Sequence, residues 1–249
     1  MKQDIYDDKV HFTSQYVLTK GAFAFDAHTY DSWIEWQQAF RPRLREILGL
    51  DTLASGLADY QPRVQRYQID DMGDHYREYW RIWTEPTVPL PFYLLRPKTD
   101  GPYPLVFTPH GHNHPHIYVG ITHNEAEKKS VQEGERDIAV QAVQQGYLAI
   151  APTTRAFGET RTEQDKADNA VHSCRTQLMH DLLVGRTPIG DRVWDISMLL
   201  TWALESLPID AQRVAITGNS GGGTISVFAA ACDERITVAV PSSYFCTFT

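Results

Sequence analysis

Residues 214–222 read Val-Ala-Ile-Thr-Gly-Asn-Ser-Gly-Gly, and this stretch decides the fold prediction. Its first four residues are apolar or β-branched and indicate a short buried strand, whereas the small residues from Thr224 to Ala231 indicate a helix. Between the two, Gly218, Ser220 and Gly222 fit the pattern Gly-x-Ser-x-Gly. In that pattern a serine stands on a sharp turn from a strand into a helix, and this context makes the short motif specific.

Such a turn suits a nucleophilic serine. Side chains two residues before and after the serine would collide, and glycine at both positions removes the collision. The free N–H groups at the start of the following helix favour negative charge beside the serine. We therefore predict Ser220 as the catalytic nucleophile and the N–H of Gly221 as one donor of an oxyanion hole. The alternative, a glycine-rich turn that binds phosphate, lacks the lysine of a P-loop.

Short apolar runs alternate with helical stretches on both sides of the motif. The runs cover residues 105–107, 147–151, 214–217 and 238–240, and the helical stretches cover residues 133–145, 172–183, 191–206 and 221–232. This alternation predicts an α/β fold with a mostly parallel central sheet and helices on both faces. Residues 62–97 are rich in aromatic and branched side chains, which predicts antiparallel strands that lead into the sheet.

The domain organisation follows from the same pattern. Residues 1–60 are predicted to form an arm and helices packed on the core, and residues 61–249 the core itself. A chain of 249 residues suits one large domain of this class, and we expect a single domain.

A second oxyanion donor is expected in the loop that follows an earlier strand. After one predicted strand the sequence reads His110-Gly111-His112-Asn113. We assign the second donor to the backbone N–H of His112, with His110 packed beneath it. We expect His110, Gly111 and Asn113 to shape the substrate site. Arg155 follows another predicted strand and could either line the pocket or form a structural ion pair.

The histidines at positions 110, 112, 114 and 116 suggest a competing hypothesis, a metal site. Alternate residues of an extended strand share one face. However, Gly111 and Pro115 favour an irregular loop, and no Cys, Asp or Glu stands at ligand spacing nearby. We therefore predict neither a metal nor a cofactor.

The three cysteines, Cys174, Cys232 and Cys246, have no metal-ligand spacing and cannot all pair. Cys174 lies two residues after His172 and could be a rival nucleophile, but a buried thiol on a helix is the simpler interpretation.

The composition limits the classes of binding partner that we expect and the cellular location of the protein. The chain has 23 basic and 31 acidic residues, a formal net charge of −8, which argues against nucleic acid or an anionic membrane as the main partner. The polar start at Met1 to Val10 does not fit a secretory signal, and no apolar run is long enough to span a bilayer. We therefore expect a reduced, cytoplasmic setting.

Taken together, the Ser220 turn, the His-Gly loop and Arg155-Ala156-Phe157-Gly158-Glu159 resemble the α/β-hydrolase superfamily. The run from Gly185 to Asp195 is similar to the acetylxylan-esterase-like and dienelactone-hydrolase-like branch. This resemblance covers roughly residues 90–245. It implies hydrolysis of a carboxylic ester, often on a carbohydrate, through an acyl-enzyme on Ser220 and without a cofactor. Peptidases and thioesterases use the same turn and remain alternatives.

The sequence departs from the family after the nucleophile. In this fold the catalytic acid and then the histidine follow the serine. The 29 residues after Ser220 contain Asp233 and Glu234 but no histidine, so we expect the sheet to end with the strand at 238–240. Four explanations stay open: a fragment of a longer protein, a base from a partner chain, a degenerate hydrolase that serves as a binding module, or an internal base such as His112, His123 or His172. An open sheet edge would also favour self-association.

Overall fold

The computed structural model describes residues 6–18, 23–25 and 32–243. These residues divide into two compact units, one that extends to Leu44 and one that begins at Arg45. Helix α1 (Asp8–Leu18) lies in the first unit, and α2 (Trp33–Leu48) runs across the boundary. The Oγ of Ser32 accepts a hydrogen bond from the N–H of Glu35, which caps α2. The expectation that residues 1–60 pack on the core stays a prediction.

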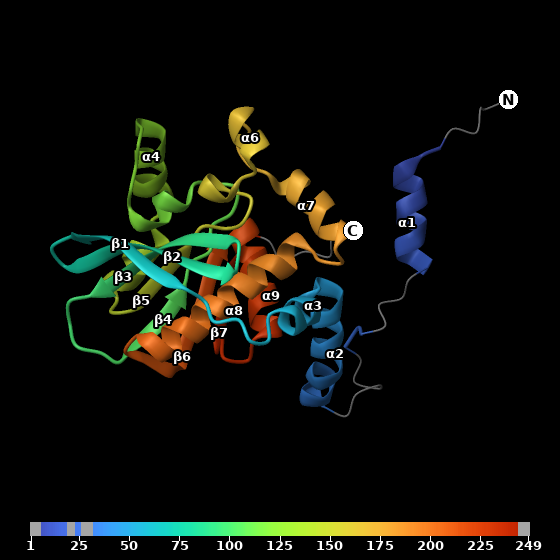
Figure 1. The fold of residues 1–249 in the computed structure, drawn as a ribbon, viewed down its shortest axis with the longest axis horizontal. Helices are drawn as coiled ribbons and strands as arrows, with labels where there is room; N and C mark the ends of the chain where they lie inside the picture. Colours follow the sequence, from blue (N-terminus) through green and yellow to red (C-terminus); the bar gives the residue numbers. More distant parts are fainter. Residues whose placement is uncertain (1–5, 19–22, 26–31, 244–249) are drawn as a thin grey trace. The chain divides into compact units, whose positions relative to one another are not determined.

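The second unit is built on a mixed sheet, which within the described residues has seven strands in the order β1-β2-β3-β5-β4-β6-β7 (Figure 1). The strands are β1 (Val64–Asp71), β2 (His75–Glu85), β3 (Val88–Pro97), β4 (Tyr103–Phe107), β5 (Leu148–Pro152), β6 (Ile209–Asn219) and β7 (Val238–Ser242). The first three strands are antiparallel neighbours, and β3 is antiparallel to β5. Strands β5, β4, β6 and β7 are parallel. A parallel arrangement therefore holds for this half of the sheet only.

In this unit one short helix precedes β1, and the other helices lie in the connections between the parallel strands. They are α3 (Leu50–Gly56), α4 (Glu125–Gly134), α5 (Ile138–Gln144), α6 (Glu163–Ala167), α7 (Cys174–Leu183), α8 (Pro188–Ser206) and α9 (Gly221–Cys232), with short 3₁₀ turns η1 (Pro115–Val119) and η2 (Gly158–Thr160). The helix expected at 133–145 is two helices, because Glu135 adopts a left-handed conformation with φ of 50° and separates α4 from α5.

Both faces of the sheet are covered, as an α/β fold requires. On one face, Val106 and Ala149 pack with Ala139 and Val143 of α5 in a fully buried cluster. Neighbouring side chains along a strand point to opposite faces. On the other face, the ring of Phe92 lies 5.4 Å from that of Trp202 on α8. The predicted α/β class is therefore confirmed, with the helices in the predicted two layers.

The topology gathers several loops at one edge of the sheet. Because β4, β5, β6 and β7 are parallel, their carboxyl ends meet at the same edge, where ligands bind in open α/β sheets. The loops that begin at Thr108, Thr153 and Ser220 start at this edge. Strand β7 stands last in the sheet order, with Val238 and Val240 exposed. In the described part of the chain, no helix is long and apolar enough to cross a membrane.

Candidate active site

Ser220 occupies the single-residue turn between β6 and α9. Its backbone has φ of 56° and ψ of −119°, a region that non-glycine residues rarely adopt. The N–H of Ser220 donates to the carbonyl oxygen of Ser242 at 2.9 Å, and α9 starts at the next residue. Such strain persists only where the surrounding structure imposes it, and it is typical of functional sites.

The two flanking glycines are required by the close approach of the backbone that follows β4. A Cβ on Gly218 would lie 2.4 Å from the carbonyl oxygen of Pro109, and one on Gly222 would lie 2.0 Å from it. Both distances are far below van der Waals contact, so no larger residue fits. The turn after β6 is thus packed directly on the backbone that leaves β4.

The predicted oxyanion loop lies against this turn. A Cβ on Gly111 would lie 2.7 Å from the carbonyl oxygen of Asn219 and 3.0 Å from the nitrogen of Gly221. The N–H of Gly111 donates to the Oδ1 of Asn113 at 3.1 Å, so the side chain of Asn113 holds the loop. The structure therefore brings together the predicted site residues Gly111, His112, Ser220 and Gly221.

His110 lies below the loop, where the sequence analysis placed it. Its side chain is 1% exposed. The Nε2 accepts a hydrogen bond from the N–H of Thr154 at 2.9 Å, so Nδ1 carries the proton and donates to the carbonyl oxygen of Gly111 at 2.8 Å. Burial lowers the pKa of His110 to about 4, and the ring is neutral at neutral pH. The buried imidazole supports the loop, and its predicted part in shaping the substrate site stays a prediction.

A second group of side chains surrounds the ring of His112. The ring centroid lies 5.2 Å from that of Phe157 and 5.1 Å from that of His172. The Nε2 of His112 is 4.0 Å from the Sγ of Cys174, which in turn is 3.7 Å from the Nη2 of Arg192. Burial lowers the pKa of His112, and the charges of His172 and Arg192 lower it further.

This group contains residues that the sequence analysis did not assign to the site. Phe157 and Arg192 lie in stretches that carry the family resemblance, but neither residue is predicted as a site residue, and His172 is predicted only as one of three possible internal bases. Cys174 was interpreted as a buried thiol within a helix, whereas it is half-buried and begins α7. Each comes from a different loop or helix, and only the tertiary fold shows that they meet.

His114, His116 and His123 pack with one another. The ring centroid of His123 is 4.4 Å from that of His116, whose Nε2 is 3.2 Å from a carboxylate oxygen of Glu127. His114 stacks on His116 at 5.1 Å. Among the residues that the structure describes, no three His, Cys, Asp or Glu side chains are arranged to hold a metal ion.

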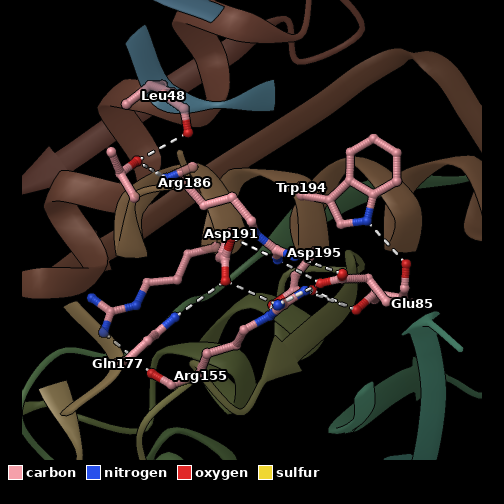
Figure 2. A network of polar contacts seen from close by, with 12 residues as sticks. Leu48, Glu85, Arg155, Gln177, Arg186, Asp191, Trp194 and Asp195 are labelled. Carbon is pink, nitrogen blue, oxygen red and sulfur yellow. Dashed lines mark hydrogen bonds and ion pairs between the residues drawn. The ribbon is translucent and has the colours of Figure 1, made fainter. Parts of the chain in front are cut away.

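Arg155 is the centre of a buried ion network (Figure 2). Its Nε and Nη2 bind the two carboxylate oxygens of Asp195 at 2.7 and 2.6 Å, and its Nη1 binds Glu85 at 2.6 Å and Asp191 at 3.1 Å. Burial lowers the pKa of Arg155, but the attraction of Asp195, Asp191 and Glu85 outweighs it and the net pKa is raised. Of the two roles left open by the sequence, Arg155 thus forms the structural ion pair, and it also borders a cavity of about 790 Å³.

Solved structures with the same fold include two esterases by name. The chain superimposes with a TM-score of 0.78 on a Bacteroides fragilis protein named as an acetyl xylan esterase, at 18% identity, covering 99% of this chain and 63% of that one. An acetyl xylan esterase from Paenibacillus sp. R4 gives a TM-score of 0.52 at 16% identity, covering 80% of this chain and 63% of that one. At such identities the likeness shows the α/β-hydrolase fold.

Sequence comparison gives the family. The Bacillus subtilis (strain 168) protein YtaP, named as a hydrolase, is 24% identical over 194 residues, which are 76% of this chain and 60% of YtaP. The chain thus spans less than two thirds of the length of these relatives. The family model that matches covers residues 10–248, nearly the whole chain. The Ser220 turn and the Gly111–His112 loop packed on it fit the family that this match gives. The chain belongs to the Abhydrolase family of hydrolases.

Proposed function

We propose that this hydrolase cleaves carboxylic esters through an acyl-enzyme on Ser220. The observation that carries the proposal is the geometry of the turn, where Ser220 has φ of 56° at the first turn of α9 and the Gly111–His112 loop packs against Gly221. A strained serine at a helix N-terminus beside a second backbone loop is the arrangement that acyl transfer needs.

In this reaction the Oγ of Ser220 forms a bond to the ester carbonyl carbon as its proton passes to a base. The N–H groups of Gly221 and His112 stabilise the oxyanion of the tetrahedral intermediate. The alcohol then leaves, and water attacks the acyl-enzyme to release the acid. The side chain of Asn113 occupies the N–H of Gly111, which leaves the next N–H of the loop, that of His112, for the oxyanion. One such donor typically contributes about a hundredfold to a thousandfold in kcat.

The positions of the histidines reduce the number of candidates for the base that accepts the proton of Ser220. His112 and His172 lie in the group of side chains beside the turn, whereas His123 packs against His116. An internal base would therefore be His112 or His172. A base supplied by another part of a longer protein or by a partner chain stays an alternative within this proposal.

The substrate class that we propose is an acetylated carbohydrate. This proposal rests on the names of the two esterases with the same fold. It is tested by comparing release of acetate from acetylated xylo-oligosaccharides with hydrolysis of p-nitrophenyl acetate.

The experiment that tests the function is rapid-mixing hydrolysis of p-nitrophenyl acetate by the chain and its Ser220→Ala variant. We expect a burst of p-nitrophenol that approaches one equivalent and disappears in the variant, because the acyl-enzyme cannot form. Ser55→Ala is the matched control, since this exposed serine bonds only its own turn at the carbonyl oxygen of Thr52. An equal burst in all three proteins would contradict the proposal.

A further inference from the structure

The cavity beside the ion network lies on the part of the carboxyl edge that follows β5, apart from the residues of the Ser220 turn. Its wall includes Glu85, Arg155, Gln177, Asp181, Arg186 and Asp191. The volume of about 790 Å³ is that of a small-molecule site. Neither Ser220 nor the Gly111–His112 loop borders it, so an inference from this cavity goes beyond the proposed esterase function.

In the network the carboxyl groups outnumber the guanidinium groups. Its guanidinium groups belong to Arg155 and Arg186, and its carboxylates to Glu85, Asp181, Asp191 and Asp195. Arg186 binds Glu85 and Asp191 at 2.7 and 2.8 Å. Two positive charges thus face four carboxyl groups. Glu85 and Asp191 bind both guanidinium groups, and Asp195 binds that of Arg155.

Within the described residues, Asp181 is the carboxyl group of this set that has no ion pair with either guanidinium, although the side chain of Gln177 forms a hydrogen bond with it. It is 8% exposed, it lines the cavity, and its Oδ2 has no hydrogen-bond partner. The Oε1 of Gln177, one turn earlier on α7, is likewise buried without a partner, while the Nε2 of that amide points to Asp191 at 3.4 Å. In Figure 2 a dashed line joins the amide of Gln177 to the carboxylate of Asp191. Buried acceptors without a donor are costly, and a native structure rarely leaves two together.

The surroundings of Asp181 favour a positive partner. Burial raises the pKa of Asp181 to about 6, the charge of Asp191 raises it as well, and Arg186, Arg155 and the Gln177 amide oppose the shift. His180, on the same helix, also lines the cavity. Two further basic side chains of the cavity wall are engaged elsewhere, because Lys166 pairs with Glu163 and Arg161 donates to the carbonyl oxygens of Gly158 and Ala170.

We propose that this cavity binds a small organic cation, an ammonium or amidinium group, through the Asp181 carboxylate and the amide oxygen of Gln177. Such a group supplies both a positive charge and several N–H donors, which matches the charge deficit and the two unpartnered acceptors. A metal ion fits less well, since within the described residues no three His, Cys, Asp or Glu side chains are placed to coordinate one.

The probe that tests this site is benzylamine, with benzyl alcohol as the neutral match, and the readout is binding by calorimetry. At about pH 8 the amine is protonated and Asp181 is ionised, so we expect benzylamine to bind at least about tenfold more tightly than benzyl alcohol. In Asp181→Asn we expect that preference to disappear. Glu163→Gln is the control, because this residue lines the same cavity but is exposed and paired with Lys166.

The pH dependence adds a second readout. As the pH falls from about 8 to about 5, Asp181 takes up a proton and the affinity for benzylamine is expected to fall about tenfold. Asp181→Asn should not show this fall. Three results would overturn the proposal: equal affinity for the amine and the alcohol, unchanged binding of the amine in Asp181→Asn, or no binding of the amine at about pH 8. Because binding is measured directly, these outcomes are independent of whether Ser220 is a nucleophile.

Discussion

At the scale of single residues, His110 shows how a buried neutral imidazole can hold the loop that follows β4. Its Nδ1–H donates to the carbonyl oxygen of Gly111, and its Nε2 accepts from the N–H of Thr154 on the loop after β5. The ring therefore connects the loops that follow β4 and β5. Protonation would remove the acceptor at Nε2 and place a charge in a fully buried site.

This role predicts a defined pH dependence of folding stability. The pKa of His110 falls from 6.5 in the unfolded chain to about 4 in the folded protein. The unfolded state then binds the extra proton, so the contribution of His110 is complete above about pH 6.5 and is lost as the pH falls toward 4, by up to about 1.4 kcal/mol per pH unit.

Urea unfolding of the His110→Gln variant at several pH values measures this contribution. We expect the variant to be less stable by about 1–3 kcal/mol near pH 7, since one buried hydrogen bond is lost. We also expect a flatter decline in stability between about pH 6.5 and 4. His11→Gln, at an exposed position, is the control. A variant whose stability declines as steeply as that of the wild type would rule out this role.

Asp181 contributes a pH dependence of folding stability whose sign is opposite to that of His110. Its folded pKa of about 6 lies above its ordinary value of 3.8, so ionisation destabilises the folded protein as the pH rises above 3.8, and the full cost is reached above about 6. We expect Asp181→Asn to be more stable than the wild type by about 1–2 kcal/mol near pH 8 and to show no gain near pH 4. Thermal unfolding at the two pH values measures the difference, and an equal gain at both would contradict it.

Local sequence predicted the residues of the turn but not their neighbours. Ser220, Gly221, Gly111 and His112 could be assigned because each belongs to a short motif whose geometry is local. The contacts among His112, Phe157, His172, Cys174 and Arg192 depend on how the segments after β5 and around α7 and α8 lie over β4. No periodicity in the sequence carries that information.

At the scale of elements, the junction between β6 and α9 depends on how closely two backbones approach. Gly222 of α9 lies against Pro109 at the end of β4, where an added Cβ would be 2.0 Å from the carbonyl oxygen. The helix must move away to accommodate any side chain there. Such a shift would displace the N–H of Gly221 from the oxyanion position.

The Gly222→Ala variant tests this packing. We expect a loss of about 3 kcal/mol or more in unfolding free energy, from overpacking against a backbone that cannot yield. The matched control is Gly56→Ala at the end of α3, where no atom lies within 4 Å of the added Cβ. That change should alter stability by no more than about 1 kcal/mol, and upward. A change in Gly222→Ala as small as that in Gly56→Ala would show that the turn after β6 tolerates a side chain.

The alternation of strands and helices was predictable because buried strands and helices differ in length and pattern. The antiparallel start at residues 62–97 also agrees with the expectation. The break between α4 and α5 was not predicted, since Glu135 is not a residue that ordinarily adopts a left-handed conformation.

At the scale of the whole second unit, the ion network ties together segments far apart in the sequence. Arg155 follows β5, Glu85 ends β2, and Asp191 and Asp195 lie in α8. A network of this kind fixes the sheet against α8, but its net contribution to folding stability depends on every charge keeping its partner.

Substitution of Arg155 should therefore lower the free energy of unfolding strongly. We expect Arg155→Met to destabilise the protein by about 3–5 kcal/mol, because Asp195 and Asp191 would stay buried without their shared partner. The control is Arg213→Met, whose side chain is 58% exposed and pairs with Asp210. It should change stability by less than about 1 kcal/mol. Urea unfolding of both variants compares them, and similar small losses would contradict a structural role for the network.

The sequence alone could not decide between the two possible roles of Arg155. The residue lies after a strand at the carboxyl edge of the sheet, where both a pocket residue and an ion pair are expected. Its partners lie 36 to 70 positions away in the sequence. Only the fold shows that three carboxylates converge on one guanidinium.

The most direct test of the central claim is labelling with a fluorophosphonate followed by mass spectrometry of the peptides. We predict one adduct on the peptide that contains Ser220, and no adduct in the Ser220→Ala variant, because only a serine beside oxyanion donors is activated toward phosphorus. Labelling of another residue would contradict the assignment of Ser220 as the nucleophile, and an unlabelled wild-type chain would contradict activation of Ser220 by an internal base.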